Sequence, residues 1–244
     1  MDTINAVSSW IKKQVGKAGA KGIVVGLSGG IDSAVVAALA KRSLDPEVLG
    51  LILPCHSESQ DALDARLVAI HLGLETITVD LTPVFDLLLT LLPPADVTIT
   101  ANLKPRLRML TLYHYAGLRQ YLVAGTSNKS EIAVGYFTKF GDGGADLLPL
   151  GDMLKSEVWA MAKKLGLPEA IIKKTPSAGL VPGQTDEGEL SISYDQLDKA
   201  LLAIASSRQA SIPPGVRERV EYLMKSSEHK RKRIPVFKMS SAHG

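Results

Sequence analysis

Residues 22–44 read GIVVGLSGGIDSAVVAALAKRSL, and this stretch decides the fold. Residues 22–27 form a short apolar run rich in β-branched side chains, which is typical of a buried strand. Residues 33–44 carry apolar side chains at helical spacing. Two glycines lie between these segments and allow a tight turn. The stretch therefore predicts a strand, a glycine loop and a helix, which is the opening unit of an α/β sheet.

The rest of the first half repeats this alternation. Apolar runs at residues 48–53, 75–79 and 121–124 predict three more strands. Helical periodicity between and around them predicts helices at residues 61–72, 82–92 and 104–119, with a loop from Pro93 to about residue 102. Strands that alternate with helices indicate βαβ units, so we expect an α/β fold: an open, mostly parallel sheet with helices on both faces.

Beyond the fourth strand the pattern loosens. Further helices are predicted at the amphipathic N-terminus and at residues 153–165, 194–204 and 216–224. Residues 133–152 and 175–191 are expected to be long loops, and long loops in compact domains are often functional. We expect them to act as lids.

Composition excludes several classes of protein. With 244 residues, 45% of them hydrophobic, the chain can bury a full core and is not disordered. A net charge of +3 is too small for a dedicated nucleic-acid binder. The single cysteine, Cys55, excludes a disulfide framework and a four-cysteine zinc site and fits a reducing compartment. No signal peptide and no membrane-spanning run is recognisable, so a cytoplasmic location is expected.

The glycine loop has the chemistry of a phosphate site. It lies between a strand and the N-terminus of a helix, whose free N–H groups and dipole attract anions. Ser28 and Ser33 add hydroxyl donors. Asp32 would repel a phosphate, so its presence makes sense if a divalent cation lies between the two. The alternative is that Asp32 or Ser33 caps the helix.

The loop is neither a Walker A sequence nor a G-x-G-x-x-G dinucleotide fingerprint. SGGIDS after a first strand resembles instead the PP-loop of the ATP pyrophosphatase superfamily. Members of that superfamily adenylate a substrate with ATP and release pyrophosphate. The superfamily includes enzymes of amide formation and of tRNA thiolation, so this loop alone leaves the substrate open.

The second half of the chain discriminates among them. GTSNKSE at residues 125–131 and GYFTKFGDGGADLLPLGDMLKSEV at residues 135–158 look like the signature of NAD synthetase. PSAGLVPGQTDE at residues 176–187 and the late His229-Lys230-Arg231 fit in the same order. The resemblance implies an adenine nucleotide alpha hydrolase-like, Rossmann-like fold and one NAD synthetase domain over residues 1–244. An added glutaminase domain does not fit this length, which indicates the ammonia-dependent form.

The resemblance implies a ligase that forms a C–N bond. Deamido-NAD (nicotinic acid adenine dinucleotide) would react with ATP to an acyl-adenylate, and ammonia would convert this to NAD⁺ with release of AMP and pyrophosphate, as the final step of NAD biosynthesis. ATP is the implied cosubstrate, Mg²⁺ the implied cofactor and a homodimer the implied assembly. Nucleic acid and membrane are not expected as partners, and an external source of ammonia stays open.

The resemblance also implies an ATP site. The corresponding positions are Gly26, Leu27, Ser28, Gly29, Gly30, Ile31, Asp32, Ser33, Thr126, Lys155 and Ser177. Thr126 could contact the nucleotide, cap the helix that follows, or do both. Lys155 can reach phosphates as a point charge, against the alternative of a surface lysine. Ser177 keeps a hydroxyl where relatives often have threonine.

Two carboxylates are expected to share a metal. Asp32 and Glu131 each follow a strand, so both belong at the carboxyl edge of the sheet, where two acids can bind one Mg²⁺. The family assigns that role to the matching positions. The alternative for Glu131 is a solvated helix residue.

The deamido-NAD site is implied by the resemblance at Arg108, Lys139, Asp146, His229 and Lys230. Arg106 and Arg108 cannot share one helix face, so at most one of them would bind the dinucleotide, and the motif favours Arg108. Asp32, Lys155 and Asp142 are the candidate catalytic residues. Of these, Asp142 would hold ammonia. The alternative for Asp142 is an ordinary Asp-Gly turn.

Two other functions stay open at this point. One is a different adenylating enzyme, such as a GMP-synthetase-like amidase or a tRNA modifier, although paired cysteines and a strongly basic face are lacking. The other is a nucleotide-binding module without activity, since a fold does not by itself imply a reaction.

Overall fold

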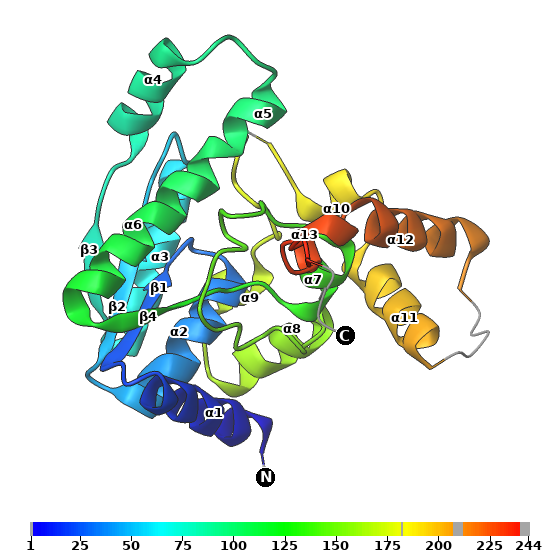
Figure 1. Ribbon diagram of the computed structural model, residues 1–244. Helices are drawn as coiled ribbons and strands as arrows, with labels where there is room; N and C mark the ends of the chain where they lie inside the picture. Colours follow the sequence, from blue (N-terminus) through cyan, green and yellow to red (C-terminus); the bar gives the residue numbers. More distant parts are fainter. Residues whose placement is uncertain (1, 182, 207–211, 240–244) are drawn as a thin grey trace.

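The computed structural model describes residues 2–181, 183–206 and 212–239. These residues form a four-stranded sheet of β1 (Gly22–Gly26), β2 (Val48–Ile52), β3 (Glu75–Thr78) and β4 (Tyr121–Ala124). The strand order is β3-β2-β1-β4, and every neighbouring pair is parallel. The predicted parallel α/β sheet is confirmed (Figure 1).

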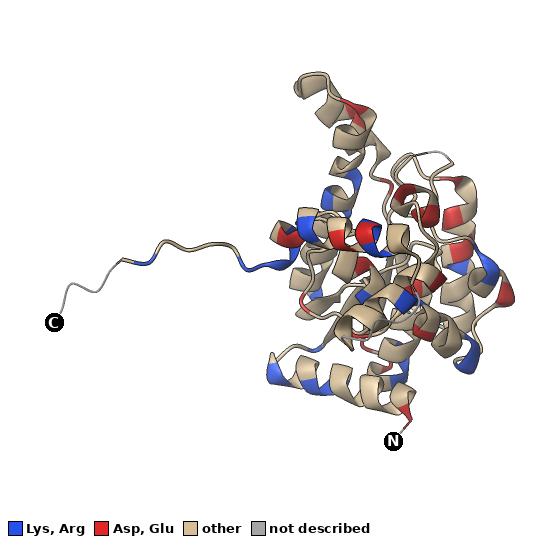
Figure 2. Cartoon of the chain, turned by 90° about the vertical axis from the view of Figure 1, so that its right-hand side faces the viewer, with Lys and Arg blue, Asp and Glu red and all other residues tan. Residues whose placement is uncertain are grey.

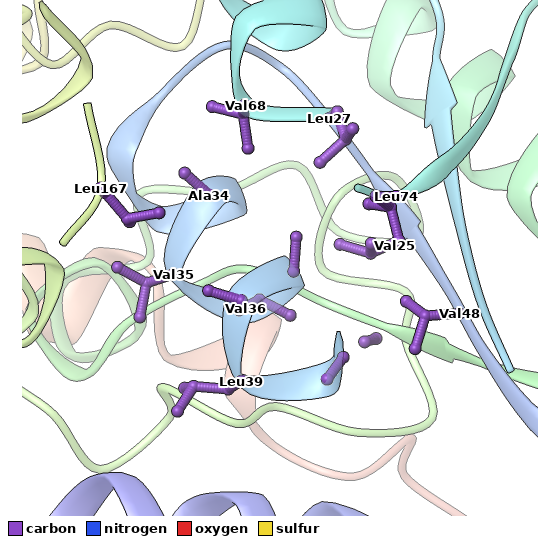
Figure 3. Packing of buried hydrophobic residues seen from close by; sticks show 14 of the residues in the cluster. Val25, Leu27, Ala34, Val35, Val36, Leu39, Val48, Val68, Leu74 and Leu167 are labelled. Atoms are coloured by element: carbon purple, nitrogen blue, oxygen red, sulfur yellow. The ribbon is translucent and has the colours of Figure 1, made fainter. Parts of the chain in front are cut away.

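One face of the sheet is covered by α2 (Ile31–Leu44), with α1 (Thr3–Lys17), α3 (Ser59–Leu72) and α8 (Lys155–Lys164) packed around it. Because strand side chains alternate, Val25 of β1 points to this face. There it packs with Val35, Val36 and Leu39 of α2 (Figure 3). α2 is apolar on most sides, as expected for a helix buried between a sheet and other helices.

The opposite face is covered by α6 (Leu103–Arg119), and α4 (Thr82–Leu91) packs against α6. Val24 of β1 and Val123 of β4 pack here with Phe85 and Ala116. The outward side of these helices stays apolar, since Leu87 and Leu110 are 60% and 64% exposed.

A separate group of helices lies beside the sheet and its covering helices. In it α11 (Tyr194–Ala205) and α12 (Pro214–Ser226) pack on each other and on α7 (Lys129–Val134), around their own apolar cluster. After α13 (Glu228–Arg231) the chain extends away from the body, with basic side chains at its start (Figure 2). In the described ranges no helix combines the length and the apolar character needed to cross a membrane.

Four short helices were not predicted. These are α5 (Val97–Ala101), α9 (Glu169–Lys173), α10 (Asp186–Leu190) and α13, of which α5 and α10 fall in segments expected to be loops. Helices of four or five residues are too short to be stable alone and depend on packing, which sequence periodicity does not reveal. For α10 a local signal was present, because the Thr185 hydroxyl accepts a hydrogen bond from the Gly188 amide at 3.2 Å.

The strand order positions the functional residues. β1 lies between β2 and β4, and all these strands are parallel, so β1 and β4 end at the same edge of the sheet. From β1 the chain continues to β2 on one side, whereas β4 lies on the other side, so the strand order reverses between β1 and β4. A crevice at such a switch point is where open α/β sheets bind ligands. The glycine loop follows β1 and the segment before α7 follows β4, so both meet at this crevice.

Candidate active site

Hydrogen bonds of its own side chains fix the conformation of the loop between β1 and α2. The Ser33 hydroxyl donates to the Gly30 carbonyl at 2.9 Å and accepts from the Ser28 amide at 3.3 Å. Gly29 has φ +78°, and a Cβ on it would lie 2.5 Å from the Asp61 carbonyl oxygen, so only glycine fits between loop and α3. Gly30 is the N-cap of α2 and no side chain caps the helix. The helix-cap interpretation of Asp32 and Ser33 is therefore wrong.

Asp32 instead faces residues from the other half of the chain. Its Oδ2 lies 2.5 Å from Lys155 Nζ, and its Oδ1 accepts from Asn128 Nδ2 at 2.9 Å. Lys155 Nζ also lies 3.4 Å from Glu131 Oε1. Three segments separated by up to 123 residues thus bring two carboxylates and one ammonium together. The strand-edge positions predicted a shared edge for the two carboxylates but not the place of Lys155 between them.

Glu131 is held by the N-terminus of its own helix. The Asn128 side chain accepts from the Glu131 amide at 3.0 Å, and Glu131 Oε2 accepts from the Asn128 amide at 3.1 Å, which is a capping box. The predicted cap at Thr126 is wrong, because α7 begins at Lys129 and Asn128 takes that position. Thr126 remains at the end of β4 and lines the cavity described below.

The cluster is buried and rich in negative charge. Lys155 is only 1% exposed, which excludes the surface-lysine interpretation. Burial and the neighbouring Asp32 charge raise the pKa of Glu131 to about 8. Burial alone would lower the pKa of Lys155, but the attraction of Asp32 and Glu131 outweighs it and the pKa is raised.

A further buried carboxylate adds to this excess. Asp186 Oδ2 accepts from the Tyr194 hydroxyl at 2.8 Å, and the same hydroxyl lies 3.4 Å from Glu131 Oε1. Asp186 Oδ1 is buried with no hydrogen-bond partner in the described part of the chain. Three carboxylates therefore surround one ammonium, an arrangement that favours a bound cation.

The donor set suits Mg²⁺. This ion binds to proteins through one or two carboxylates and takes its other ligands from water and substrate phosphates. Asp32 and Glu131 supply two carboxylates beside a loop that can bind phosphate. The described ranges contain no cluster of three or more His, Cys, Asp or Glu that would make an all-protein metal site.

A cavity of about 490 Å³ opens at this edge of the sheet. Of the residues expected at the ATP site, all but Gly29 line it: Gly26, Leu27, Ser28, Gly30, Ile31, Asp32, Ser33, Thr126, Lys155 and Ser177. Glu131 lines it as well. Gly29, also in the loop, packs against α3 instead. The expected ATP residues thus converge on one space within a single chain.

Three residues expected at the dinucleotide site or as ammonia ligand line the same cavity. Arg108 donates through Nε to the Leu53 carbonyl at 3.1 Å and through Nη2 to Ser57 Oγ at 3.1 Å. Lys230 donates to the carbonyls of Gly135 and Phe137, each at 2.8 Å. Asp142 Oδ1 accepts from the Thr138 amide at 2.9 Å, so Asp142 both closes a turn and borders the cavity.

The other three lie outside the cavity lining. Lys139 Nζ donates to the His229 carbonyl at 2.7 Å, which joins these two residues to each other. Asp146 accepts from the Tyr113 hydroxyl of α6 at 3.1 Å and from the Val123 amide at 2.8 Å. Arg106 is exposed and donates to the Lys139 carbonyl at 3.3 Å. Of the six residues expected to bind the dinucleotide or ammonia, the described chain therefore brings three to the cavity lining and leaves Lys139, Asp146 and His229 outside it.

Asn128, Asp186 and Tyr194 belong to the site but were not predicted from the sequence. Asn128 had a readable signal, because an asparagine three residues before a glutamate is the capping-box pattern. Asp186 and Tyr194 had none, because their role depends on how α10 and α11 pack against α7. The long loop before α10 is itself tied to α3, since Lys174 Nζ lies 2.8 Å from Asp61 Oδ1 and 2.5 Å from Asp64 Oδ2.

Comparison with known proteins places this geometry in a family. The family model described as NAD synthase matches residues 3–234. The NH(3)-dependent NAD(+) synthetase of Carboxydothermus hydrogenoformans is 47% identical over 236 residues, which cover 95% of this chain and 94% of that protein.

Two solved structures are similar over almost their whole length. An NMN synthetase from Francisella tularensis superposes with a TM-score of 0.90 at 38% identity, covering 97% of this chain and 98% of that one. An NH3-dependent NAD synthetase from Campylobacter jejuni superposes with a TM-score of 0.86 at 31% identity, covering 98% and 100% of the two chains.

Proposed function

The chain belongs to the NAD synthase family, and from this premise we propose how its own residues carry out the family's reaction. The reaction is the ATP-dependent amidation of deamido-NAD by ammonia to NAD⁺, the last step of NAD biosynthesis, and the enzyme is a ligase. The observation that supports this most strongly is the convergence of Asp32, Glu131 and Lys155 beside the glycine loop.

The loop side of the cavity is assigned to ATP. Backbone N–H groups at the start of α2 and the Ser28 and Ser33 hydroxyls can donate to phosphate oxygens. Lys155 supplies a fixed positive charge for the leaving pyrophosphate. Asp32 and Glu131 would hold Mg²⁺, which when bound neutralises further phosphate charge.

The reaction balances without a nucleophile from the protein. The nicotinate carboxylate oxygen attacks the α-phosphorus of ATP, and the bond to pyrophosphate breaks. The ammonia nitrogen then attacks the acyl carbon, the bond to AMP breaks, and one proton leaves the nitrogen as the amide forms. The residues bind and orient the partners and exclude water, which would hydrolyse the adenylate.

The dinucleotide is assigned to residues inside and outside the cavity. Arg108, Lys230 and Asp142 would contact the part of deamido-NAD that enters it. Lys139, Asp146 and His229 would contact the remainder. Positive side chains suit its pyrophosphate, since charge-assisted hydrogen bonds to phosphate are strong.

A homodimer would complete this second part. The outward side of α4 and α6 exposes Leu87, Leu91, Leu110 and Leu118, at 60%, 71%, 64% and 67%. An apolar surface of this kind marks a protein interface, and identical chains most often pair through the same patch around a two-fold axis. Tyr113 of α6 holds Asp146, so the apolar surface adjoins the dinucleotide residues.

A mononucleotide acceptor is the second candidate. The Francisella tularensis relative is an NMN synthetase. Nicotinic acid mononucleotide lacks the AMP half of deamido-NAD and would need only the residues that line the cavity, which is the subset that one chain brings together.

The single cysteine of the chain, Cys55, is buried as a free thiol. A free thiol is compatible with a reducing compartment, and the cytoplasm is the place proposed for the reaction.

The deciding experiment measures all products with each acceptor. Purified enzyme is incubated with ATP, Mg²⁺ and ammonium, together with deamido-NAD, nicotinic acid mononucleotide or xanthosine monophosphate. We expect NAD⁺, AMP and pyrophosphate in equal amounts, with the highest kcat/KM for deamido-NAD. A higher kcat/KM for the mononucleotide would favour the second candidate. ATP binding without pyrophosphate release from any acceptor would contradict both.

A further inference from the structure

Asp198 on α11 is a buried carboxylate that the reaction as described does not use. It is 4% exposed, and none of the lysine or arginine side chains that the structure describes forms an ion pair with it. A buried carboxylate without a cation is costly unless hydrogen bonds satisfy both oxygens. The partners of these oxygens therefore indicate what the residue does.

Both oxygens are bonded to the two helices that carry the catalytic side chains. Ser130 Oγ of α7 donates to Asp198 Oδ1 at 2.5 Å, and the Ser156 amide of α8 donates to Asp198 Oδ2 at 2.9 Å. The Ser130 hydroxyl in turn accepts from the Lys155 amide at 3.0 Å. One carboxylate thus joins the first turn of α7 to the first turn of α8.

These contacts flank the reactive groups directly. Ser130 precedes Glu131, and Ser156 follows Lys155. Because consecutive Cα atoms across a trans peptide are a fixed distance apart, holding Ser130 and Ser156 limits how far the Glu131 and Lys155 backbones can move relative to each other.

The same face of α11 also touches the side chains of the site. Tyr194 lies four residues before Asp198 and therefore on the same side of the helix. Its hydroxyl lies 3.4 Å from Glu131 Oε1, and its ring centroid lies 4.9 Å from Lys155 Nζ. α11 thus contacts both catalytic residues, at their backbone through Asp198 and at their side chains through Tyr194.

α11 is also attached through apolar side chains. Leu197, Ala200 and Leu201 pack in an apolar cluster with Val134 of α7 and Val220 of α12. Burial of apolar area is the main favourable term for such packing. A charge placed beside this cluster therefore calls for a reason other than holding the helix.

We propose that Asp198 is a positioning residue for the reaction, which rests on the function proposed above. It fixes the separation of Glu131 and Lys155 and so keeps the MgATP site in the geometry that the adenylation step needs. It does not line the cavity and acts through Ser130, Ser156 and the Lys155 amide.

The test compares Asp198→Asn with Asp195→Asn. The control makes the same change on the same helix, at a side chain that is 71% exposed and pairs only with Lys199 among its described neighbours. Binding of Mg²⁺ with a non-hydrolysable ATP analogue is measured by calorimetry, and kcat and both KM values are measured in the NAD⁺ assay. Melting temperature reports folding.

For Asp198→Asn we expect kcat and MgATP affinity to fall about ten-fold or more, the range that loss of a charge-assisted hydrogen bond gives. The KM for deamido-NAD should change less than about three-fold, and Asp195→Asn should match the wild type in every readout.

A purely structural role would give a lower melting temperature while kcat and MgATP affinity of the folded protein stay within about two-fold of wild type, and this result would overturn the proposal. If Asp198→Asn does not fold, Ser130→Ala decides by the same readouts, because it removes the bridging hydroxyl and leaves the bond to the Ser156 amide. MgATP affinity needs no acceptor. A wild type that makes no NAD⁺ would therefore contradict the proposed function alone, while unchanged MgATP affinity and kcat in both variants would contradict the role of Asp198.

Discussion

The residues proposed to bind ATP and those proposed to bind the dinucleotide are arranged differently in the fold. Asp32, Glu131 and Lys155 stand in the first turns of three helices, two of which directly follow the neighbouring strands β1 and β4, and they meet within 3.4 Å inside one chain. Lys139, Asp146 and His229 stand in loops or in the short last helix, outside the cavity that the ATP residues share. The proposed ATP residues thus meet within one chain, whereas these three proposed dinucleotide residues lie outside the shared cavity.

This contrast indicates which contacts the fold itself guarantees. Parallel strands deliver their carboxyl ends to one edge, so residues that follow them are brought together by the sheet topology. Residues on loops and near a terminus have no such constraint. In the proposed homodimer a second chain would complete them, and the exposed apolar side of α4 and α6 that would form the interface adjoins Asp146.

The largest effect is expected from the two carboxylates. Asp32→Asn and Glu131→Gln each remove one charge from the cation site while keeping the side-chain size, and the loss of a charged metal–phosphate clamp costs several kcal/mol at the transition state. Pyrophosphate release should fall at least about hundred-fold. Release is measured across a Mg²⁺ titration, with circular dichroism as the folding control.

Asp152→Asn is the matched control, since Asp152 is 96% exposed and pairs only with Lys129 among its described neighbours. Near-normal turnover of both carboxylate variants at low Mg²⁺ would mean that Asp32 and Glu131 do not serve a cation.

The next effect should sort by ligand. Lys155→Ala should weaken ATP use or slow adenylation, whereas Lys139→Ala and Lys230→Ala should raise the KM for deamido-NAD with little change for ATP. A charge-assisted hydrogen bond is worth roughly 1.5–3 kcal/mol, or about ten- to hundred-fold in apparent affinity. KM is measured for each substrate with the other saturating.

Lys173→Ala serves as the control for these lysines, because Lys173 is 73% exposed and pairs with Glu169 on its own short helix. If Lys139→Ala and Lys230→Ala impair ATP as strongly as deamido-NAD, the division of the site into two sides is wrong.

A moderate effect is expected from the apolar surface. Leu110→Glu places a charge at a side chain that is 64% exposed on α6 and should convert a dimer into monomers, since burying an unpaired carboxylate in an interface is costly. Light scattering measures the mass. Ile70→Glu makes the same change at an 80% exposed position of α3, over the other face of the sheet, and should leave the mass unchanged. A monomeric wild type would contradict the proposal that α4 and α6 form a dimer interface.

The smallest effect is expected at Ser177. Its hydroxyl accepts from the Gly179 amide at 3.1 Å and lines the cavity from an exposed loop. Ser177→Ala removes one neutral hydrogen bond, worth roughly 0.5–1.5 kcal/mol, so the KM for ATP should rise about two- to ten-fold. A larger rise in the KM for ATP would mean that Ser177 is as important for ATP binding as Lys155. Ser177→Thr keeps the hydroxyl and should retain the wild-type KM.

The fold was largely predictable because its signals are local. All four strands and the long helices show plain periodicity, and the observed bounds differ from the predicted ones by only a few residues. The failures lie where stability comes from packing. α5 and α10 are too short to show a period, and the choice of Asn128 over Thr126 as cap depends on where α7 starts.

For the site, sequence and resemblance could assign residue types to ligands but not their environment. That Asp32 and Glu131 share an edge follows from the strand pattern. The burial of Lys155 between them, and the contribution of Tyr194 and Asp198 from α11, depend on contacts across 24 to 123 residues. The positions of Lys139 and His229 outside the cavity likewise could not be read from a motif.

The contrast between the two sides is tested most directly by the affinities of the monomeric Leu110→Glu protein for its two ligands. Calorimetry gives the Kd of MgATP analogue and of deamido-NAD for this variant and for the wild type. If one chain holds the whole ATP site but only part of the dinucleotide site, the Kd for the ATP analogue should stay within about three-fold and that for deamido-NAD should rise about ten-fold or more. Unchanged affinity for both ligands, or equal loss of both, would contradict this account.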